Sequence, residues 1–395
     1  MKELLKNKVF QIIMATDTIQ QMSIWVRNMA VLFFVIEQTD ADPVAISLIT
    51  IFEYLPIFVF SYFGGAMADK WNPKKTMIIG DSLSALSVLV ILFLIMQGYW
   101  QAVFAATLVS SIVTQFSAPS SVIMFKRNID EHLITPAISI SQSMLSLYLI
   151  VGPIIGTFLY ETLGIQASLT IIAAMFFISS MVQFMLPNSP RNAEQANATV
   201  MHQLKDGLVY IIHDQGLRVL FTVLAIFGFA TGLIQPLTVF ILTERLGIDA
   251  QNLQWFYALS GVGLLVGAIL SMTIVNKLKT STVLFLCMVV FAALTATEAF
   301  STLVYITAPL YFLSGVTTAF VQVAISSPLI KTVPEEYVGR VNGMVSPLLI
   351  GGLLIGAALS GVLMKELSLI PVYLISVFFI LLSGMICRLY KETGN

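Results

Sequence analysis

Long apolar runs recur along almost the whole chain and leave little sequence that could form a water-soluble surface. Each run is long enough to cross a hydrocarbon core of about 30 Å, which takes about 20 helical residues. Only 10% of the residues are charged and 57% are hydrophobic, whereas soluble domains average about 25% charged residues. We therefore predict an all-α integral membrane protein with twelve transmembrane helices. Their approximate limits are 10–37, 43–68, 74–97, 99–125, 136–160, 164–186, 217–242, 250–276, 281–300, 303–330, 336–364 and 367–390.

One long polar stretch, residues 187–216, separates the sixth run from the seventh. Its first part, NSPRNAEQANAT, has the composition of a loop, and its second part, HQLKDGLVYIIHD, can form a short surface helix. We therefore predict an N-terminal six-helix bundle over residues 1–186, a cytoplasmic linker over 187–216 and a C-terminal six-helix bundle over 217–395. A weak similarity between residues 126–137 and 331–342 falls where a two-fold repeat would put it, so the bundles are expected to be pseudo-symmetric.

The Lys and Arg residues indicate how the chain is oriented. If both termini are cytoplasmic, 17 of the 20 Lys and Arg residues lie on that side. Arg245 and Lys365 then lie on the other side, and Arg27 lies within the membrane. This asymmetry follows the positive-inside rule. It predicts a multi-pass membrane protein with both termini in the cytoplasm.

The charged stretch GGAMADKWNPKKT, residues 64–76, joins the second run to the third. Gly65 and Asp69 are one helical turn apart and lie on the same helix face. Asn72-Pro73 suits an N-cap followed by the first residue of the next helix. The stretch resembles the signature loop between helices 2 and 3 of the major facilitator superfamily, roughly G-x-x-x-D-[RK]-x-G-[RK]-[RK]. Asn72 and Pro73 stand where that pattern has a glycine and a basic residue.

Three further stretches, residues 53–70, 141–160 and 334–344, resemble the macrolide-efflux branch of the drug exporters in this superfamily. The resemblance implies secondary transport in which Asp69 bridges the two halves at the inner face. We assign the cytoplasmic gate to Gly65, Asp69, Lys70, Lys74, Asp81 and Arg340.

Gly152, Pro153 and Gly156 partly match the antiporter motif of the family's fifth helix. Small residues let helices pack closely and a proline bends a helix. An ordinary glycine packing face is the alternative. The family's fourth helix often carries a buried arginine, whereas residues 109–111 carry none. This departure weakens the expectation that protons are coupled in the family's best-known way.

Polar residues in the apolar runs are functional candidates because charge inside lipid is costly. On the first helix Asp17, Gln20, Gln21, Ile24, Arg27 and Asn28 share one stripe, roughly 120° wide. Such a stripe should face a cavity or a partner. The candidates for lining a substrate cavity are Gln20, Gln21, Ile24, Asn28, Gln115, Gln142, Gln235 and Gln322. For the glutamines, packing without ligand contact is an equal alternative, and Glu298 lies near the outer end of its run, where it can reach water.

Arg27 and Glu53 both lie about 14 Å below the outer ends of consecutive helices, counted at 1.5 Å per residue. We predict that they pair within the membrane and help to couple protons to the cargo, because an unpaired arginine at that depth would be costly. A static pair that only fixes helix packing is the alternative. Asp17 is the rival, or second, proton site.

Together these features and the resemblance predict proton-coupled export of amphipathic drug-like molecules across the bacterial cytoplasmic (inner) membrane, by two bundles that rock around a central cavity. The drug-like class, and with it a role in antibiotic resistance, comes from the resemblance alone. Export of a siderophore or a lysolipid-type metabolite is an alternative, which Arg27 would suit. A membrane-embedded enzyme is disfavoured because no cluster has triad or ligand spacing, and a channel because the repeat and the Gly-Pro helix favour alternating access. The expected partners are a small-molecule substrate, protons and the bilayer, with no cofactor, metal or nucleic acid and a monomeric chain.

Overall fold

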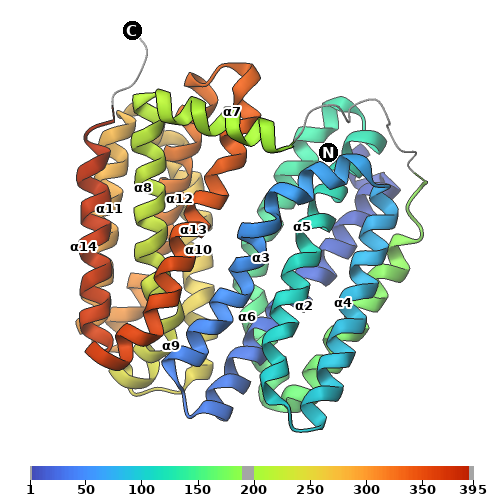
Figure 1. Ribbon diagram of the computed structural model, residues 1–395, viewed down its shortest axis with the longest axis horizontal. Helices are drawn as coiled ribbons and strands as arrows, with labels where there is room; N and C mark the ends of the chain where they lie inside the picture. The colour runs from blue at the N-terminus through green and yellow to red at the C-terminus, as the bar shows by residue number, and fades with distance from the viewer. Residues whose placement is uncertain (1, 189–199, 391–395) are drawn as a thin grey trace. The chain divides into compact units, whose positions relative to one another are not determined.

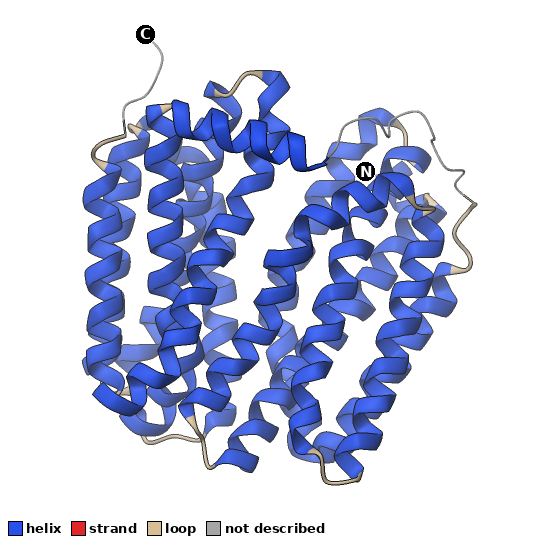
Figure 2. Cartoon of the chain, viewed as in Figure 1, coloured by secondary structure: helices blue, strands red, loops and turns tan. Residues whose placement is uncertain are grey.

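The computed structural model describes residues 2–188 and 200–390. Within these ranges, the side chains of residues 2, 62–70, 131, 135, 200–205, 276, 330–332, 335, 336, 338–340 and 342 lie outside the description. The described residues form helices joined by short connections, and none of them forms a strand (Figure 2). An all-helical chain meets the requirement that every backbone polar group inside lipid be hydrogen-bonded internally.

The main helices are named here in chain order. They are α1 (Lys2–Lys6), α2 (Lys8–Thr39), α3 (Pro43–Lys70), α4 (Pro73–Met96), α5 (Val103–Asn128), α6 (Glu131–Gln183), α7 (Val200–His213), α8 (Gln215–Ile234), α9 (Thr238–Phe240), α10 (Leu253–Ile274), α11 (Thr280–Phe300), α12 (Val304–Thr332), α13 (Glu335–Leu367) and α14 (Leu369–Cys387). Short 3-10 or π turns are η1 (Trp100–Ala102), η3 (Gln235–Leu237), η4 (Ile241–Leu246), η5 (Ala250–Asn252) and η6 (Val275–Lys277). Helix α7 forms where the sequence predicts a short helix in the linker.

Eleven segments of the described chain are long and apolar enough to cross a membrane. The longest, residues 132–183, lies in α6, whose 53 residues would extend about 80 Å as one straight helix. This is more than twice the thickness of a hydrocarbon core. At Gly164 the backbone of α6 leaves helical geometry, with φ 72° and ψ −177°. The position agrees with the gap predicted between the fifth and sixth apolar runs.

Local sequence explains where two of these helices begin. Asn72 caps α4, because its side chain accepts a hydrogen bond from the Lys75 amide at 3.1 Å and Pro73 follows it as the first helical residue. Helix α6 begins at Glu131, five residues before the predicted start at Pro136, so that expectation was wrong. Pro136 is the sixth residue of α6, so it removes one intrahelical hydrogen bond, which an amide at this position would donate to the His132 carbonyl.

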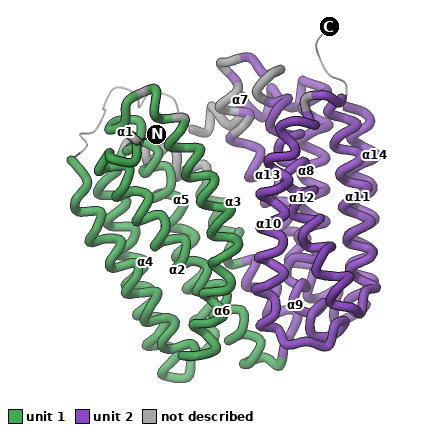
Figure 3. Tube along the Cα trace, turned by 180° about the vertical axis from the view of Figure 1, so that it is seen from behind, with its two compact units in different colours: residues 1–40, 52–200 green, residues 41–51, 201–395 purple. Residues whose placement is uncertain are grey.

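The chain divides into two compact units (Figure 3). Unit 1 consists of residues 1–40 and 52–200, and unit 2 of residues 41–51 and 201–395. The division at residue 200 falls inside the predicted linker. The first residues of α3 group with unit 2, which the predicted domain limits do not include.

In unit 1, α2 packs along α6, and α4 packs against both α5 and α6. Gly156 of α6 lies so close to α2 that a β-carbon there would be 2.9 Å from the Trp25 carbonyl oxygen. The Trp25 side chain covers Gly152 one turn earlier. The backbone at Pro153 stays helical, so the break in α6 comes at Gly164. The predicted helix 5 motif is therefore a close-packing face between α6 and α2.

In unit 2, α8 packs along α13 and α10 along α12, while α8, α11 and α14 lie side by side (Figure 1). The contact between α8 and α13 has no room for a side chain at Gly232, where an added β-carbon would meet the Leu353 carbonyl group. Small residues that allow backbones to approach are typical of packing inside membranes.

The first turn of α3 is fastened to α13 within unit 2. Lys365 Nζ donates to Asp42 Oδ2 at 2.8 Å. Partial burial alone would raise the pKa of Asp42, but hydrogen bonds from Lys365 and from the amides of Val44 and Ala45 lower it below its usual value. This ion pair is partly exposed and favours the charged carboxylate.

Candidate functional site

The polar stripe of α2 lines a cavity of about 280 Å³ inside unit 1. Helices α4, α5 and α6 supply its other walls. Several site residues that the sequence analysis predicted on separate helices line this cavity together. The predicted site residues that line it are Asp17, Gln20, Gln21, Ile24, Asp81 and Gln142.

Asp81 of α4 is the best-satisfied polar group of the cavity. It is 2% exposed. Gln20 Nε2 donates to both of its carboxylate oxygens, at 3.0 and 2.8 Å. Ser179 Oγ and Gln183 Nε2, both on α6, donate to Asp81 Oδ2 at 2.6 and 2.8 Å. Four hydrogen bonds to one carboxylate tie α2, α4 and α6 together and stabilise its charged form.

Asp17 of α2 lies in the same cavity but has no hydrogen-bond partner among the described residues. It is close enough to Asp81 and to Tyr148 for electrostatic interaction. The Tyr148 hydroxyl is engaged with Thr18 Oγ1 at 2.7 Å. Asp17 is therefore the carboxylate that can still accept hydrogen bonds from a molecule in the cavity.

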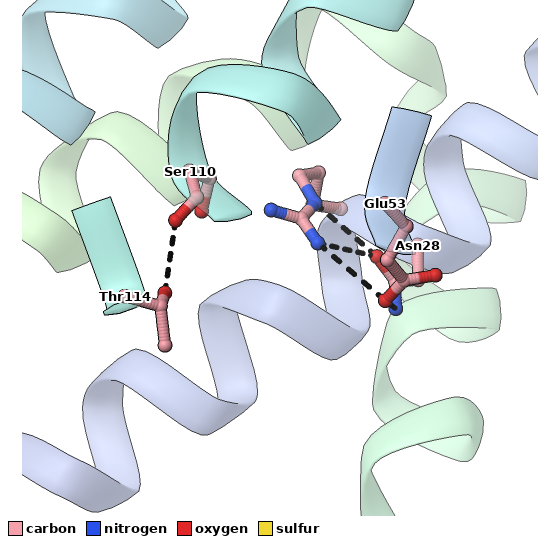
Figure 4. Close-up of polar contacts among 5 residues, drawn as sticks. Asn28, Glu53, Ser110 and Thr114 are labelled. Carbon is pink, nitrogen blue, oxygen red and sulfur yellow. Dashed lines mark hydrogen bonds and ion pairs between the residues drawn. The ribbon is translucent and has the colours of Figure 1, made fainter. Parts of the chain in front are cut away.

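Arg27, Asn28 and Glu53 form a second polar cluster, which does not belong to the residues lining the cavity (Figure 4). Arg27 is 2% exposed, and its Nη2 lies 3.9 Å from Glu53 Oε1, so the predicted pair is present. Asn28 joins the two charges: its Oδ1 accepts from Arg27 Nε and Nη2 at 3.2 and 2.8 Å, and its Nδ2 donates to Glu53 at 3.1 Å. The role of this cluster in coupling remains a prediction.

Arg27 Nη1 is buried and has no hydrogen-bond partner within the part of the chain that the structure describes. Figure 4 shows Ser110 and Thr114 of α5 on the side of the view opposite to Asn28 and Glu53. Thr114 Oγ1 donates to the Ser110 carbonyl at 2.9 Å and so is satisfied within its own helix. Helix α5 therefore carries neutral hydroxyl groups at this position. The fourth helix of the superfamily that the sequence resembles often carries an arginine.

The remaining cavity candidates do not gather at this site. Asn28 belongs to the ion-pair cluster, and Gln115 of α5 is outside the residues that line the cavity. Gln235 lies in η3 and Gln322 on α12, both in unit 2. Of the residues predicted to line a substrate cavity, Gln20, Gln21, Ile24 and Gln142 line the cavity of unit 1.

The predicted gate is only partly described. The side chains of Gly65, Asp69, Lys70 and Arg340 lie outside the described residues. Lys74 Nζ donates to the carbonyls of Phe184 and Leu186 at 2.8 and 2.6 Å, where it holds the end of α6. Cations near a helix C-terminus are favoured by the helix dipole. Asp81, which the sequence analysis assigned to the gate, lines the cavity of unit 1, and its gate role stays a prediction.

Sequence reasoning also misjudged Glu298 of α11, which was expected to reach water. It is only 9% exposed, and its neighbours include Tyr311 of α12. Ser117 and Tyr148, which line the cavity, were not selected at all. Ser and Tyr are common in apolar helices, and only the packing of α5 and α6 on α2 brings these two to the polar stripe.

Comparison with known proteins assigns this architecture to a family. The model of the family described as transmembrane secretion effector (MFS_3) matches residues 3–392. The chain is similar to the uncharacterized MFS-type transporter YkuC of Bacillus subtilis (strain 168), with 25% identity over 88% of this chain and 84% of that protein. It is also similar to macrolide efflux protein A of Streptococcus pyogenes, with 24% identity over 56% of this chain and 55% of that protein.

Two solved structures share the fold. The nucleoside transporter NupG has a TM-score of 0.77 at 16% identity, covering 98% of this chain and 99% of that chain. The D-xylose-proton symporter has a TM-score of 0.73 at 13% identity, covering 98% of each chain. At such low identity the likeness concerns the fold alone.

Proposed function

The chain belongs to the transmembrane secretion effector family of the major facilitator superfamily, and from this premise we propose that it exports amphipathic drug-like small molecules in exchange for protons. Transport would proceed by alternating access, with two six-helix bundles moving against each other. The similarity to macrolide efflux protein A, which covers about half of each chain, supports the drug-like class.

The observation that carries this proposal is the cavity of unit 1. It combines the Asp81 network, the open carboxylate of Asp17 and apolar walls from several helices. A concave site with mostly apolar walls and a few converging polar groups is what small-molecule binding requires. Polar groups inside a membrane are costly and are therefore functional candidates. We assign the polar groups of this cavity to substrate binding.

Coupling to protons is proposed to involve the Arg27–Glu53 pair. The two side chains lie on α2 and α3, and Asn28 connects them. Separation of the pair during the transport cycle would let Glu53 take up a proton in one state and release it in the other. Asp17 remains the rival proton site.

The topology belongs to the same proposal. We propose twelve crossings, with α6 counted as two because of Gly164, and both termini in the cytoplasm of a bacterial inner membrane. Cysteines can test it, since both native cysteines are buried. An impermeant thiol reagent added to intact cells should label Gln97→Cys and leave Lys75→Cys unlabelled. Labelling of Lys75→Cys from outside would overturn the topology.

Transport itself is tested with purified protein in proteoliposomes under an imposed pH gradient, scanned across amphipathic solutes that include a macrolide. We expect movement of at least one solute against its gradient, lost when a protonophore collapses the pH difference and absent from protein-free liposomes. Accumulation that persists without the pH gradient would refute proton coupling. Single-channel current steps would refute alternating access.

A further inference from the structure

We propose that the cavity of unit 1 recognises organic cations, with Asp17 as the residue that binds the positive group and the apolar walls holding the rest of the molecule. This inference rests on the proposed function in one respect, which is that the transported molecule binds in the cavity. It names the charge class of the substrate, which family membership leaves open.

The charged residues that are described in the cavity wall all have one sign. Among the described lining residues, Asp17 and Asp81 are charged and none is Lys, Arg or His. Two carboxylates that share one low-dielectric space repel each other. A bound monocation would relieve this repulsion, whereas a bound anion would add to it.

The two carboxylates are not equivalent. Asp81 accepts four hydrogen bonds from Gln20, Ser179 and Gln183 and has little capacity left. Asp17 accepts none from the described residues. Asp81 is therefore a positioning residue that fixes Gln20 at the wall, and Asp17 is the group that a ligand can reach.

A second polar group of the cavity is also unsatisfied. The Ser117 hydroxyl of α5 is buried and has no hydrogen-bond partner among the described residues, although the side chain is only 7% exposed. A buried hydroxyl without a partner is costly. The Ser117 oxygen lies against Gly80 of α4, where an added β-carbon would be 2.5 Å from it, so α4 and α5 pack closely at this edge of the cavity.

The walls suit an amphipathic molecule. Met14, Met77, Met144 and Phe176 contribute flexible and aromatic apolar surface from α2, α4 and α6. Methionine side chains adapt to ligands of different shape, and aromatic faces attract cations. The site therefore favours an aromatic or branched body attached to one positive group.

The same argument disfavours an anionic siderophore or a lysolipid phosphate. Such a substrate would need a cation in the cavity, and Arg27 is the buried arginine of α2. Arg27 lies outside the residues lining the cavity, is 2% exposed and is engaged by Asn28 and Glu53. Its charge is balanced within unit 1.

Two probes of similar size and opposite fixed charge test the proposal. Equilibrium dialysis of radiolabelled benzyltrimethylammonium and benzylsulfonate against purified full-length protein in detergent measures binding without any gradient. We expect the cation to bind at least tenfold more tightly than the anion. Asp17→Asn should weaken cation binding at least tenfold, and Asp17→Glu should restore most of it. Asp40→Asn, the same change at an exposed loop residue, should have no effect.

Equal or tighter binding of benzylsulfonate would overturn the proposal, as would unchanged cation binding in a folded Asp17→Asn protein. Thermal unfolding of each variant establishes that it is folded, and rescue by Asp17→Glu separates loss of charge from loss of structure. Proton-driven transport of a neutral or anionic solute by a protein that binds no cation would remove this inference and leave the proposed function. Cation binding without proton-driven transport would support this inference and remove the proposed proton-coupled export.

Discussion

Replacing Glu53 by Gln removes one charge of the Arg27–Glu53 pair and keeps the shape of the side chain. At 3.9 Å and an effective dielectric constant of about 20, two unit charges attract by about 4 kcal/mol. The Glu53 side chain is 24% exposed, so solvent screens part of this attraction. Asn28 also continues to accept both hydrogen bonds from Arg27 in the variant. We therefore expect the variant to fold with a loss of about 2 kcal/mol in stability, less than a fully buried pair would lose.

The functional consequence should be larger than the structural one. If Glu53 carries a proton during the cycle, Gln cannot replace it, because an amide does not titrate. Binding and exchange of substrate should persist, since Glu53 does not line the cavity. Accumulation against a gradient should fall to the level of protein-free liposomes.

The assay compares two measurements on one preparation in proteoliposomes. Counterflow of labelled substrate at equal pH measures exchange, and a pH jump measures gradient-driven accumulation. The double variant Arg27→Gln with Glu53→Gln is the matched control. It removes the unpaired charge and should recover most of the lost thermal stability without recovering accumulation. Full pH-driven transport by Glu53→Gln would refute this reasoning and move the proton site to Asp17. Recovery of transport together with stability in the double variant would show that the pair only fixes packing.

Three further predictions concern the scaffold and the gate. Gly232→Val should destabilise unit 2 by about 2 kcal/mol or more, because its side chain meets the α13 backbone. Gly343→Ala, within α13 and with open space around it, should not lower the melting temperature, because Ala favours a helix by up to about 1 kcal/mol over Gly. Asp42→Asn should lower stability at pH 7 by no more than about 1 kcal/mol, because the pair with Lys365 is partly exposed. The lowered pKa of Asp42 means that this contribution is present above the usual pKa of an aspartate and disappears as the pH falls through the lowered pKa, so the melting temperatures of the variant and the parent should converge in acid. A stability advantage of the parent that grows in acid would contradict this prediction. Asp69→Asn should abolish transport and preserve substrate binding, and a normal transport rate would exclude its gate role.

The spans were predictable because burial in lipid demands length and apolarity, which a sequence states directly. Helix α2 covers the whole predicted run 10–37, and α14 covers residues 369–387 of the predicted run 367–390. The Arg27–Glu53 pair was also predictable, since depth along two consecutive helices follows from counting residues. Each of these expectations depends only on the position of a residue along its helix axis.

Expectations that depend on how a helix is rotated or on which neighbours it meets were less successful. The position of Asp81 near the loop did not indicate that its side chain bonds to Gln20 and to the α6 residues Ser179 and Gln183. Glu298 was expected to reach water because of its depth, yet its face of α11 is buried. Nothing in the apolar pattern of α3 indicates that its first turns group with unit 2. These features depend on contacts between segments far apart in the sequence.

The two charged sites of α2 lead to separate expected defects. Asp17 and Arg27 are ten residues apart on one helix, about 15 Å at the helical rise. One lies in the cavity with an open carboxylate, and the other lies outside the lining residues with its charge balanced by Glu53. If a single carboxylate served both proton and cargo, loss of affinity and loss of coupling would always occur together. With two sites, Asp17→Asn should raise the substrate concentration needed for half-maximal counterflow at least tenfold. Glu53→Gln should leave that concentration unchanged while accumulation is lost. Counterflow with the same half-maximal concentration in both variants, combined with lost accumulation in both, would show that the division between the two sites is wrong.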